Sequence, residues 1–400
     1  MQKRVTKNAR THPTAAVVGD KDPTIADPPI EVLDVELTER CNQSCCHCYI
    51  ALPSADSHST SREMDADFFC AVFKAARKLG CSNIRFTGGE PLLRADFAQI
   101  YASAHDDGID VAVSTNGTLI TESIADLWVK KRPVAITVSI YGWDARSYDS
   151  ITRVPGSYER FLFGLGRLRE RDLPFRLRYP PIPALINNGQ AIRKVADDLG
   201  ATSVPYSWEL TLHAYNDPAI SARLRSLRIS PQQAAQEKLN EPGGREHQLE
   251  KLKQGLDTEY SDQLFHCPGA RTRPAVNAYG QLQPCLAVRH PQLMFDLLSG
   301  SLQEGLTDHF AMLRRLHVVD RHHLDRCGQC VIRSICGICP AASWTEHGDL
   351  TTPVEYFCDI AHCEARLLGF LQDEEKGWEV APQREALKRR LARSESEEAP

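Results

Sequence analysis

The sequence predicts an α/β fold, a partial (β/α)6 barrel followed by a small cysteine-rich domain. Apolar, strand-like segments alternate with amphipathic, helix-like segments from residue 30 to about residue 210. This alternation is typical of parallel strands joined by crossover helices. About six such units fit before the pattern ends, which is too few for a closed eight-fold barrel. We therefore expect an open barrel with polar site residues at the carboxyl ends of its strands.

The predicted elements follow from hydrophobic periodicity and from helix stop signals. In the helix at 65–80, Phe69, Val72, Phe73 and Ala76 share one stripe, and Gly80 ends it. Further helices are expected at 122–131, 157–171 and 189–199. The expected strands are 30–37, 83–87, 110–114, 134–140, 175–179 and 203–210.

Composition divides the chain into five parts. Residues 1–29 are polar and aperiodic, which is typical of a disordered or loosely attached segment. Residues 226–264 are polar with few apolar positions and are expected to form a surface helical connection. The predicted parts are a flexible leader at 1–29, the barrel at 30–225, the connection at 226–264, the cysteine-rich domain at 265–366, and a C-terminal helix with a solvated charged tail at 367–400.

Charge and hydropathy exclude several classes of protein. The net charge of −5 gives no basic field for nucleic acid. No signal peptide is recognisable, and no run of about eighteen apolar residues predicts a membrane span. We expect a cytoplasmic chain, where its 14 cysteines are better explained by metal binding than by disulfides.

Cys41, Cys45 and Cys48 stand in a short loop after the first predicted strand, with three and two residues between them. Such a loop can hold three corners of a 4Fe–4S cluster. A zinc knuckle or buried free thiols are the alternatives, but zinc sites usually close with a second cysteine pair soon afterwards. Here Cys46 has no place in the spacing, and Cys70 falls within a predicted helix. The three-cysteine loop therefore favours an iron–sulfur cluster with one open iron.

This loop resembles that of the radical S-adenosylmethionine (SAM) enzymes, in which SAM binds the open iron. The resemblance extends to Gly88, Gly89 and Glu90 after the second strand, which match the segment that contacts the methionine part of SAM. Ser114, Asn116 and Ser139 then match positions facing the ribose and carboxylate, and His47 matches the aromatic position near the adenine. Turn chemistry and strand-end capping alone would also explain these serines and Asn116.

The later cysteines resemble the SPASM extension of radical SAM peptide-modifying enzymes, which carries auxiliary iron–sulfur clusters. The resemblance implies one cluster on Cys327, Cys330, Cys336 and Cys358. It implies a second, with an open iron, on Cys267, Cys285 and Cys339. Only two residues separate Cys336 from Cys339, where three are usual, and a pair of zinc sites would fit C-x2-C spacings equally well. Cys70 and Cys81 are expected to be core thiols, and Cys363 has no assigned role.

The resemblance implies a maturase that cleaves SAM reductively, with a ribosomally made peptide as substrate. A haem precursor or other small molecule is the alternative, and an iron–sulfur electron carrier or scaffold is the non-enzymatic one. Leu286 stands where sulfatase maturases carry a catalytic Asp, which disfavours that activity. The segment before Ile30 is expected to be too short for a leader-binding module, so either a separate peptide carrier would be needed or the substrate is not a peptide. A flavodoxin or ferredoxin would supply electrons, and no catalytic base is assigned.

Overall fold

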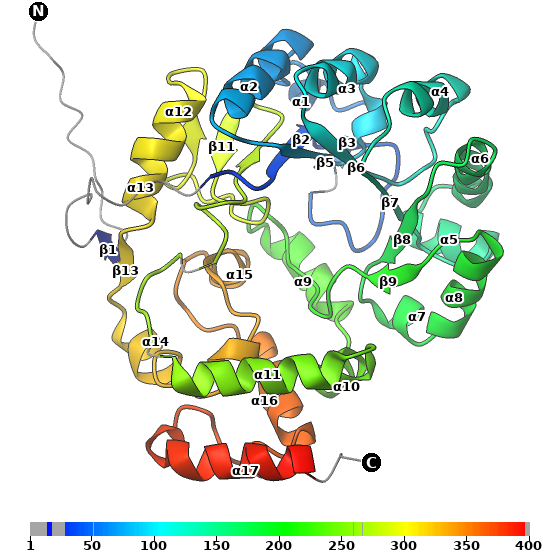
Figure 1. The fold of residues 1–400 in the computed structure, drawn as a ribbon. Coiled ribbons are helices and arrows are strands. Elements are labelled where there is room, and N and C mark those ends of the chain that lie inside the picture. Colours follow the sequence, from blue (N-terminus) through cyan, green and yellow to red (C-terminus); the bar gives the residue numbers. More distant parts are fainter. Residues whose placement is uncertain (1–13, 18–28, 51, 259, 266, 397–400) are drawn as a thin grey trace, which may run out of the picture.

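The computed structural model describes residues 14–17, 29–50, 52–258, 260–265 and 267–396, and the side chains only as far as Leu391 at the C-terminal end. Its main feature is a nine-stranded sheet in the order β12-β11-β10-β2-β5-β6-β7-β8-β9. The sheet curves into an open arc with helices around its outer side (Figure 1). The predicted α/β class and open barrel are therefore confirmed.

The six predicted barrel strands are all present, and each pairs in parallel with the next. Three helices of the arc were not predicted: one follows β5, one follows β7, and a short one follows β8. The strands are β2 (Leu33–Thr38), β5 (Asn83–Gly88), β6 (Asp110–Thr115), β7 (Ala135–Ser139), β8 (Arg176–Tyr179) and β9 (Ser203–Pro205). The outer helices are α2 (Ala66–Lys78), α3 (Phe97–Asp106), α4 (Glu122–Lys130), α5 (Ala145–Thr152), α6 (Ser157–Arg169), α7 (Pro183–Ile186) and α8 (Gly189–Asp198).

The helix α2 shows how the local sequence sets these elements. The side chain of Asp65 caps its first turn by accepting a hydrogen bond from the N–H of Phe68 at 2.9 Å. The predicted stripe of Phe69, Val72, Phe73 and Ala76 is buried. Gly80 follows the helix with a positive φ of 87°, a left-handed conformation that glycine adopts at little cost.

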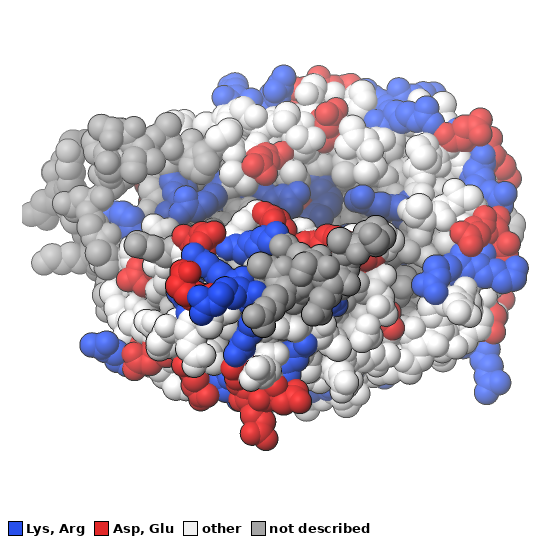
Figure 2. Space-filling model, turned by 60° about the horizontal axis from the view of Figure 1, so that its bottom comes forward, with Lys and Arg blue, Asp and Glu red and all other residues white. Residues whose placement is uncertain are grey.

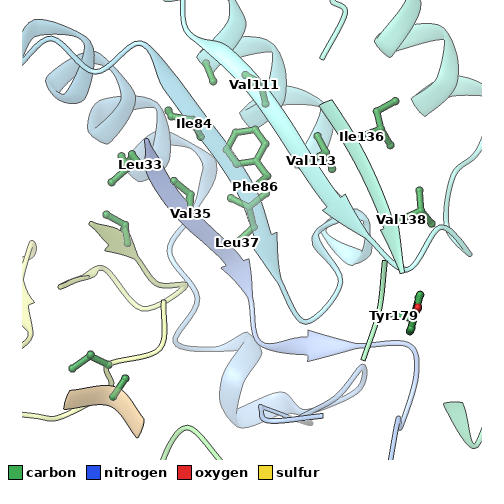
Figure 3. Close-up of a cluster of buried hydrophobic side chains, with 14 of the residues drawn as sticks. Leu33, Val35, Leu37, Ile84, Phe86, Val111, Val113, Ile136, Val138 and Tyr179 are labelled. Atoms are coloured by element: carbon green, nitrogen blue, oxygen red, sulfur yellow. The ribbon is translucent and has the colours of Figure 1, made fainter. Parts of the chain in front are cut away.

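Apolar side chains of the strands point toward the helices. Phe86 of β5 lies between Phe73 of α2 and Tyr101 of α3, with ring centroids 5.6 and 6.3 Å away. Figure 3 shows Phe86 in a row with aliphatic side chains of the neighbouring strands. Because successive residues of a strand alternate between faces, the remaining residues line the inner face of the arc. That inner face is largely polar, unlike the packed interior of a closed barrel.

Three short strands from the C-terminal half extend the sheet beyond β2. β10 (Ala275–Val276) pairs in parallel with β2, and β11 (Gln281–Gln283) and β12 (Phe295–Asp296) follow antiparallel. The barrel and the cysteine-rich part thus share one sheet. Further short elements are β3 (Arg40–Cys41), β4 (Leu52–Pro53), α1 (Ser57–Thr60), α12 (Leu302–Glu304), α13 (Phe310–Leu313), α14 (Arg321–Arg326) and α15 (Pro340–His347).

The segment 226–264 differs from the expected surface connection. It contains α10 (Pro231–Asn240) and α11 (Gly244–Asp257), preceded by α9 (Pro218–Ser226). Leu249, Leu252 and Leu256 of α11 are buried in a second apolar core with residues of α16 (Glu355–Leu367). These leucines follow a helical spacing. The prediction missed it because the segment 226–264 as a whole contains few apolar residues.

The C-terminal charged helix also packs more closely than expected for a solvated tail. Leu387 and Leu391 of α17 (Arg384–Ser396) are 1% and 3% exposed and join the same core as α11. Figure 1 shows α17 lying beneath α11. The outer end of the predicted tail, at 397–400, lies outside the described residues.

One piece of the predicted flexible leader is ordered. β1 (Ala15–Val17) pairs antiparallel with β13 (Leu316–Val318), and Ala15 is fully buried. The prediction of a loosely attached segment is wrong for these three residues. The leader at 1–13 and 18–28 lies outside the described residues. No helix in the described part of the chain has the length and apolar character needed to cross a bilayer.

Candidate active site

The three-cysteine loop lies at the carboxyl end of β2, at the position expected for an active site. Backbone hydrogen bonds fix it to the end of α5: the N–H groups of Ser44 and Cys46 donate to the carbonyls of Thr152 and Ile151 at 2.9 and 3.0 Å. Within the loop, the N–H of Cys48 donates to the carbonyl of Cys45 at 3.1 Å. The loop is therefore a compact turn.

The cysteine sulfurs of this loop lie close enough to influence one another. Burial raises the pKa of Cys41 to about 12, with smaller contributions from Glu90 and Cys48. Burial, then the neighbouring Cys48 and Cys41, raises the pKa of Cys45 as well. Without a metal the thiols of Cys41 and Cys45 stay protonated at neutral pH, so metal binding must displace their protons. Three gathered thiols suit an iron–sulfur cluster, which needs thiolate ligands.

Gly88 and Gly89 pack directly against the backbone that leads into the loop. A Cβ added at Gly88 would lie 2.1 Å from the carbonyl oxygen of Thr38, and one at Gly89 would lie 2.3 Å from that of Arg40. The N–H groups of Gly89 and Glu90 donate to these same two carbonyls at 2.8 and 2.9 Å. Glycine is required here because the end of β5 holds the cysteine loop in place.

Glu90 is fully buried between β5 and β6. Its Oε1 accepts hydrogen bonds from the Leu92 N–H at 3.1 Å and the Thr115 hydroxyl at 2.7 Å. Its Oε2 accepts one from the Asn116 N–H at 2.7 Å. Because a carboxylate offers about four acceptor positions, one remains on Oε2 for a ligand ammonium. Burial raises the pKa of Glu90 to about 7.

The side chain of Asn116 connects Glu90 with the cysteine loop. Its Nδ2 donates to Asn42 Oδ1 at 2.8 Å and lies 3.7 Å from the sulfur of Cys41. Its Oδ1 accepts from the N–H and hydroxyl of Thr118 at 3.0 and 2.6 Å. The structure thus brings Cys41, Glu90 and Asn116 together. Thr118 and Asn42 were missed because turn residues carry no distinguishing signal.

The other predicted SAM contacts are spread around this centre. Ser139 ends β7 and shares a hydrogen bond with the hydroxyl of Tyr206. Ser114 is half-buried on the inner face opposite Thr137, and Thr115 rather than Ser114 contacts Glu90. The ring of His47 lies 5.2 Å from that of Tyr141.

Two polar atoms of the cysteine loop, Nδ1 of His47 and Nε2 of Gln43, are buried and have no hydrogen-bond partner among the residues that the structure describes. Burial lowers the pKa of His47 to about 4, so its ring is neutral. Unsatisfied buried polar atoms are costly, and a bound ligand would satisfy them. The loop therefore fits a polar cofactor such as SAM as well as a cluster.

A buried ion network lies at the end of β2 and was not predicted. Arg289, fully buried, donates to Glu36 at 2.6 Å and also to Glu39. Tyr215 and Tyr279 donate to the same Glu39 carboxylate. The network ties β2 to the segment after Cys285, about 250 residues away in sequence.

Four C-terminal cysteines line one cavity, Cys327, Cys330, Cys336 and Cys358. The cavity also contacts Arg326 and His362. A Cβ added at Gly377 would lie 2.7 Å from the sulfur of Cys330, so glycine is needed at this wall. These are the four residues predicted to share an auxiliary cluster.

The other three predicted ligands, Cys267, Cys285 and Cys339, also lie near one another. Burial raises the pKa of Cys285 to about 12, with further contributions from Cys339 and Cys267. A Cβ added at Gly269 would lie 3.3 Å from the sulfur of Cys267 and 3.8 Å from Cβ of Cys285. Among the described residues, no three Cys, His, Asp or Glu side chains form a group suited to a single metal ion. Cys81 is fully buried as expected, and Cys363 is absent from the four-cysteine cavity.

Comparison with known proteins supports this geometry. Residues 35–185, which contain the cysteine loop, Glu90, Asn116 and Ser139, match the family model of the radical SAM superfamily. An AdoMet-dependent heme synthase of Methanosarcina barkeri is 25% identical over 345 residues, covering 78% of this chain and 92% of that protein. A probable GTP 3′,8-cyclase of Methanosarcina mazei is 27% identical over 270 residues, covering 64% and 77%.

Solved structures share the fold at low sequence identity. SuiB of Streptococcus suis, bound to its precursor peptide SuiA, superposes with a TM-score of 0.59 at 15% identity, covering 81% of this chain and 74% of SuiB. The enzyme anSMEcpe with bound AdoMet and a peptide superposes with a TM-score of 0.60 at 13% identity, covering 90% of this chain and 100% of that chain. Residues 35–185 of this chain therefore form a radical SAM domain.

Proposed function

We propose that the chain cleaves SAM reductively at a 4Fe–4S cluster held by Cys41, Cys45 and Cys48, and modifies a substrate by hydrogen abstraction. One observation carries this proposal: the cysteine loop contacts Asn116, whose backbone N–H donates to the buried Glu90, just after the adjoining strand β5. Cluster and SAM together supply a 5′-deoxyadenosyl radical when bound. The protein binds and orients the cofactor and the substrate, and it excludes water from the site.

Different side chains of the site are proposed to bind different parts of SAM. Glu90 accepts the ammonium of SAM at its free acceptor position, as a charge-assisted hydrogen bond. His47 lies beside the adenine as a neutral ring. Ser114, Asn116 and Ser139 lie toward the ribose and carboxylate, and the backbone of Gly88 and Gly89 holds the loop against β5.

The cysteine-rich part holds auxiliary clusters and corresponds to a SPASM domain at 265–366. Its support is the cavity lined by Cys327, Cys330, Cys336 and Cys358. Cys267, Cys285 and Cys339 hold a second cluster whose remaining iron is open to another ligand. These clusters serve as electron acceptors for the substrate, and a flavodoxin or ferredoxin reduces the first cluster.

Formation of 5′-deoxyadenosine tests the proposed function. The full chain is reconstituted with iron and sulfide without oxygen, mixed with SAM and reduced with dithionite. An enzyme releases 5′-deoxyadenosine and methionine, whereas an electron carrier or scaffold leaves SAM intact. Intact SAM in a preparation with full iron content would refute the proposal.

A ribosomally made peptide is the first candidate substrate. Its support is the shared fold with SuiB and anSMEcpe, whose structures contain peptides. A separate carrier protein would then present the peptide.

A haem precursor is the second candidate, favoured by the heme synthase relative that aligns over 92% of its own length. Deuterated substrates separate the two candidates, because hydrogen abstraction transfers deuterium to 5′-deoxyadenosine. We expect deuterium to reach 5′-deoxyadenosine from only one of the two substrates, either a peptide encoded beside this gene or a haem precursor.

A further inference from the structure

The inner face of the barrel carries a row of arginines. Asp34 pairs in register with Arg85, Thr137 with Arg176, and Ser139 with Arg178. Arg176 and Arg178 flank Leu177, which is fully buried on the opposite, helix-packed face. Alternation along β8 therefore places both guanidinium groups on the inner face.

Only the first of these arginines is neutralised by a carboxylate. Arg85 donates from Nε and Nη2 to the two oxygens of Asp34 at 2.6 and 2.8 Å. Arg176 donates from Nε to the Thr137 hydroxyl at 2.9 Å. Arg178 donates from Nη2 to the carbonyls of Pro205 and Tyr206 at 2.8 and 2.7 Å. Among the described residues, neither Arg176 nor Arg178 forms an ion pair.

Arg178 has unused binding capacity. Its Nε is buried and makes no hydrogen bond to a described residue. Burial lowers the pKa of its guanidinium. The like charges of Arg176 and Arg85 lower it further, whereas Tyr206 and Glu241 raise it. A nearby anion would relieve both the missing hydrogen bond and the repulsion. The guanidinium of Arg178 therefore has a hydrogen-bond donor to spare and no ion-pair partner among the described residues.

This guanidinium lies beside the candidate SAM site. Arg178 pairs in register with Ser139, whose hydroxyl bonds that of Tyr206, and the Arg178 guanidinium lies 5.4 Å from the Tyr206 ring centroid. Figure 2 shows Lys and Arg side chains together with Asp and Glu side chains around a hollow on this face of the molecule.

We propose that Arg176 and Arg178 bind an oxyanion of the substrate, a carboxylate or a phosphate group. This inference rests on the proposed function and specifies the chemical class of its substrate. A planar guanidinium binds either anion through parallel hydrogen bonds. Anchored on β8, the anionic group leaves the rest of the substrate to reach the carboxyl ends of the strands, where SAM would lie.

Titration calorimetry of the reconstituted full chain tests this site with tricarballylate, a tricarboxylate, and with pyrophosphate. We expect saturable binding of one probe, weakened about tenfold or more in Arg176→Gln/Arg178→Gln. Arg169→Gln/Arg193→Gln is the matched control, because both arginines are exposed on outer helices and the charge change is equal. Binding of tricarballylate identifies a carboxylate substrate, and binding of pyrophosphate identifies a phosphate substrate.

The conservative variant Arg178→Lys keeps the charge without the planar fork, so its affinity should fall between those of wild type and the double variant. Iron content and circular dichroism show whether each variant is folded. Absence of saturable binding of either probe to wild type, or equal affinity in a folded double variant, would overturn the inference. SAM cleavage is measured separately on wild type, so failure of the proposed function remains distinguishable.

Discussion

Oε2 of Glu90 accepts a hydrogen bond from the backbone N–H of Asn116 at 2.7 Å, and Nδ2 of Asn116 lies 3.7 Å from the sulfur of Cys41. The ends of two neighbouring strands are thereby fixed to the cysteine loop. This relationship places the carboxylate proposed to bind SAM and the predicted cluster ligands in one unit, and the prediction for Glu90 depends on it.

Glu90→Gln should weaken SAM binding by about tenfold or more, because hydrogen bonds to charged groups each contribute about 1.5 to 3 kcal/mol. Equilibrium dialysis of the reconstituted protein measures the affinity, and iron analysis confirms that the cluster is retained. Glu122→Gln is the control, since this carboxylate is 61% exposed on an outer helix. Unchanged SAM affinity in Glu90→Gln would refute its assignment.

Gly89→Ala should displace the cysteine loop, because the new Cβ would lie 2.3 Å from the carbonyl oxygen of Arg40. We expect a loss of about four irons per chain, the content of one cubane cluster, together with loss of SAM cleavage. In the control Gly166→Ala, the added Cβ meets no atom within 4 Å. Full iron content in both variants would show that the loop does not depend on this contact.

Glu36 should make the stability of the protein depend on pH. Burial raises its pKa from 4.5 to about 7, so the folded state binds the proton more tightly than the unfolded chain. The stabilisation present below pH 4.5 is lost as pH rises toward 7, on the order of 2 kcal/mol. Melting temperatures of wild type and Glu36→Gln across this range check the effect. The same pH slope in Glu36→Gln as in wild type would contradict it.

Arg326 should raise the reduction potential of the cluster predicted on Cys358. Its Nη2 donates to the sulfur of Cys358 at 3.3 Å, and hydrogen bonds to cluster sulfurs influence the potential. One charge-assisted hydrogen bond of about 1.4 kcal/mol corresponds to about 60 mV in a one-electron couple. Redox titration followed by electron paramagnetic resonance should therefore show a more negative potential in Arg326→Gln. Arg333→Gln, at the same cavity but over the Tyr260 ring, serves as control.

Much of the barrel could be predicted because its signals are local. The buried stripe from Phe69 to Ala76 and the six strands follow from periodicity within short windows. The spacing of Cys41, Cys45 and Cys48 likewise predicts one compact turn. These features need no knowledge of which distant segments meet.

The features that escaped prediction arise from contacts between distant segments. Arg289 meets Glu36 across about 250 residues, and β10 adds to the sheet beside β2. The arginines of β8 did have a local signal: Arg176 and Arg178 alternate with an apolar residue and must share one face. The pairing of β8 with its neighbouring strands is needed to show that this face of β8 lies on the inner side of the barrel.

The metal content of the C-terminal part can be measured after removal of the first cluster. In Cys41→Ala/Cys45→Ala/Cys48→Ala, the remaining iron belongs to the other cysteines. Two cubane clusters would give about eight irons and one would give about four. Zinc at one or two per chain with negligible sulfide would instead support zinc sites.

The central claim is tested most directly by reductive SAM cleavage in that same triple variant. We expect 5′-deoxyadenosine to fall to background while iron and sulfide remain on the C-terminal cysteines. Cys46→Ala/Cys70→Ala, which removes two thiols outside the predicted ligand set, should cleave SAM at the wild-type rate. Wild-type production of 5′-deoxyadenosine by the triple variant would contradict the assignment of Cys41, Cys45 and Cys48 to the SAM-cleaving cluster.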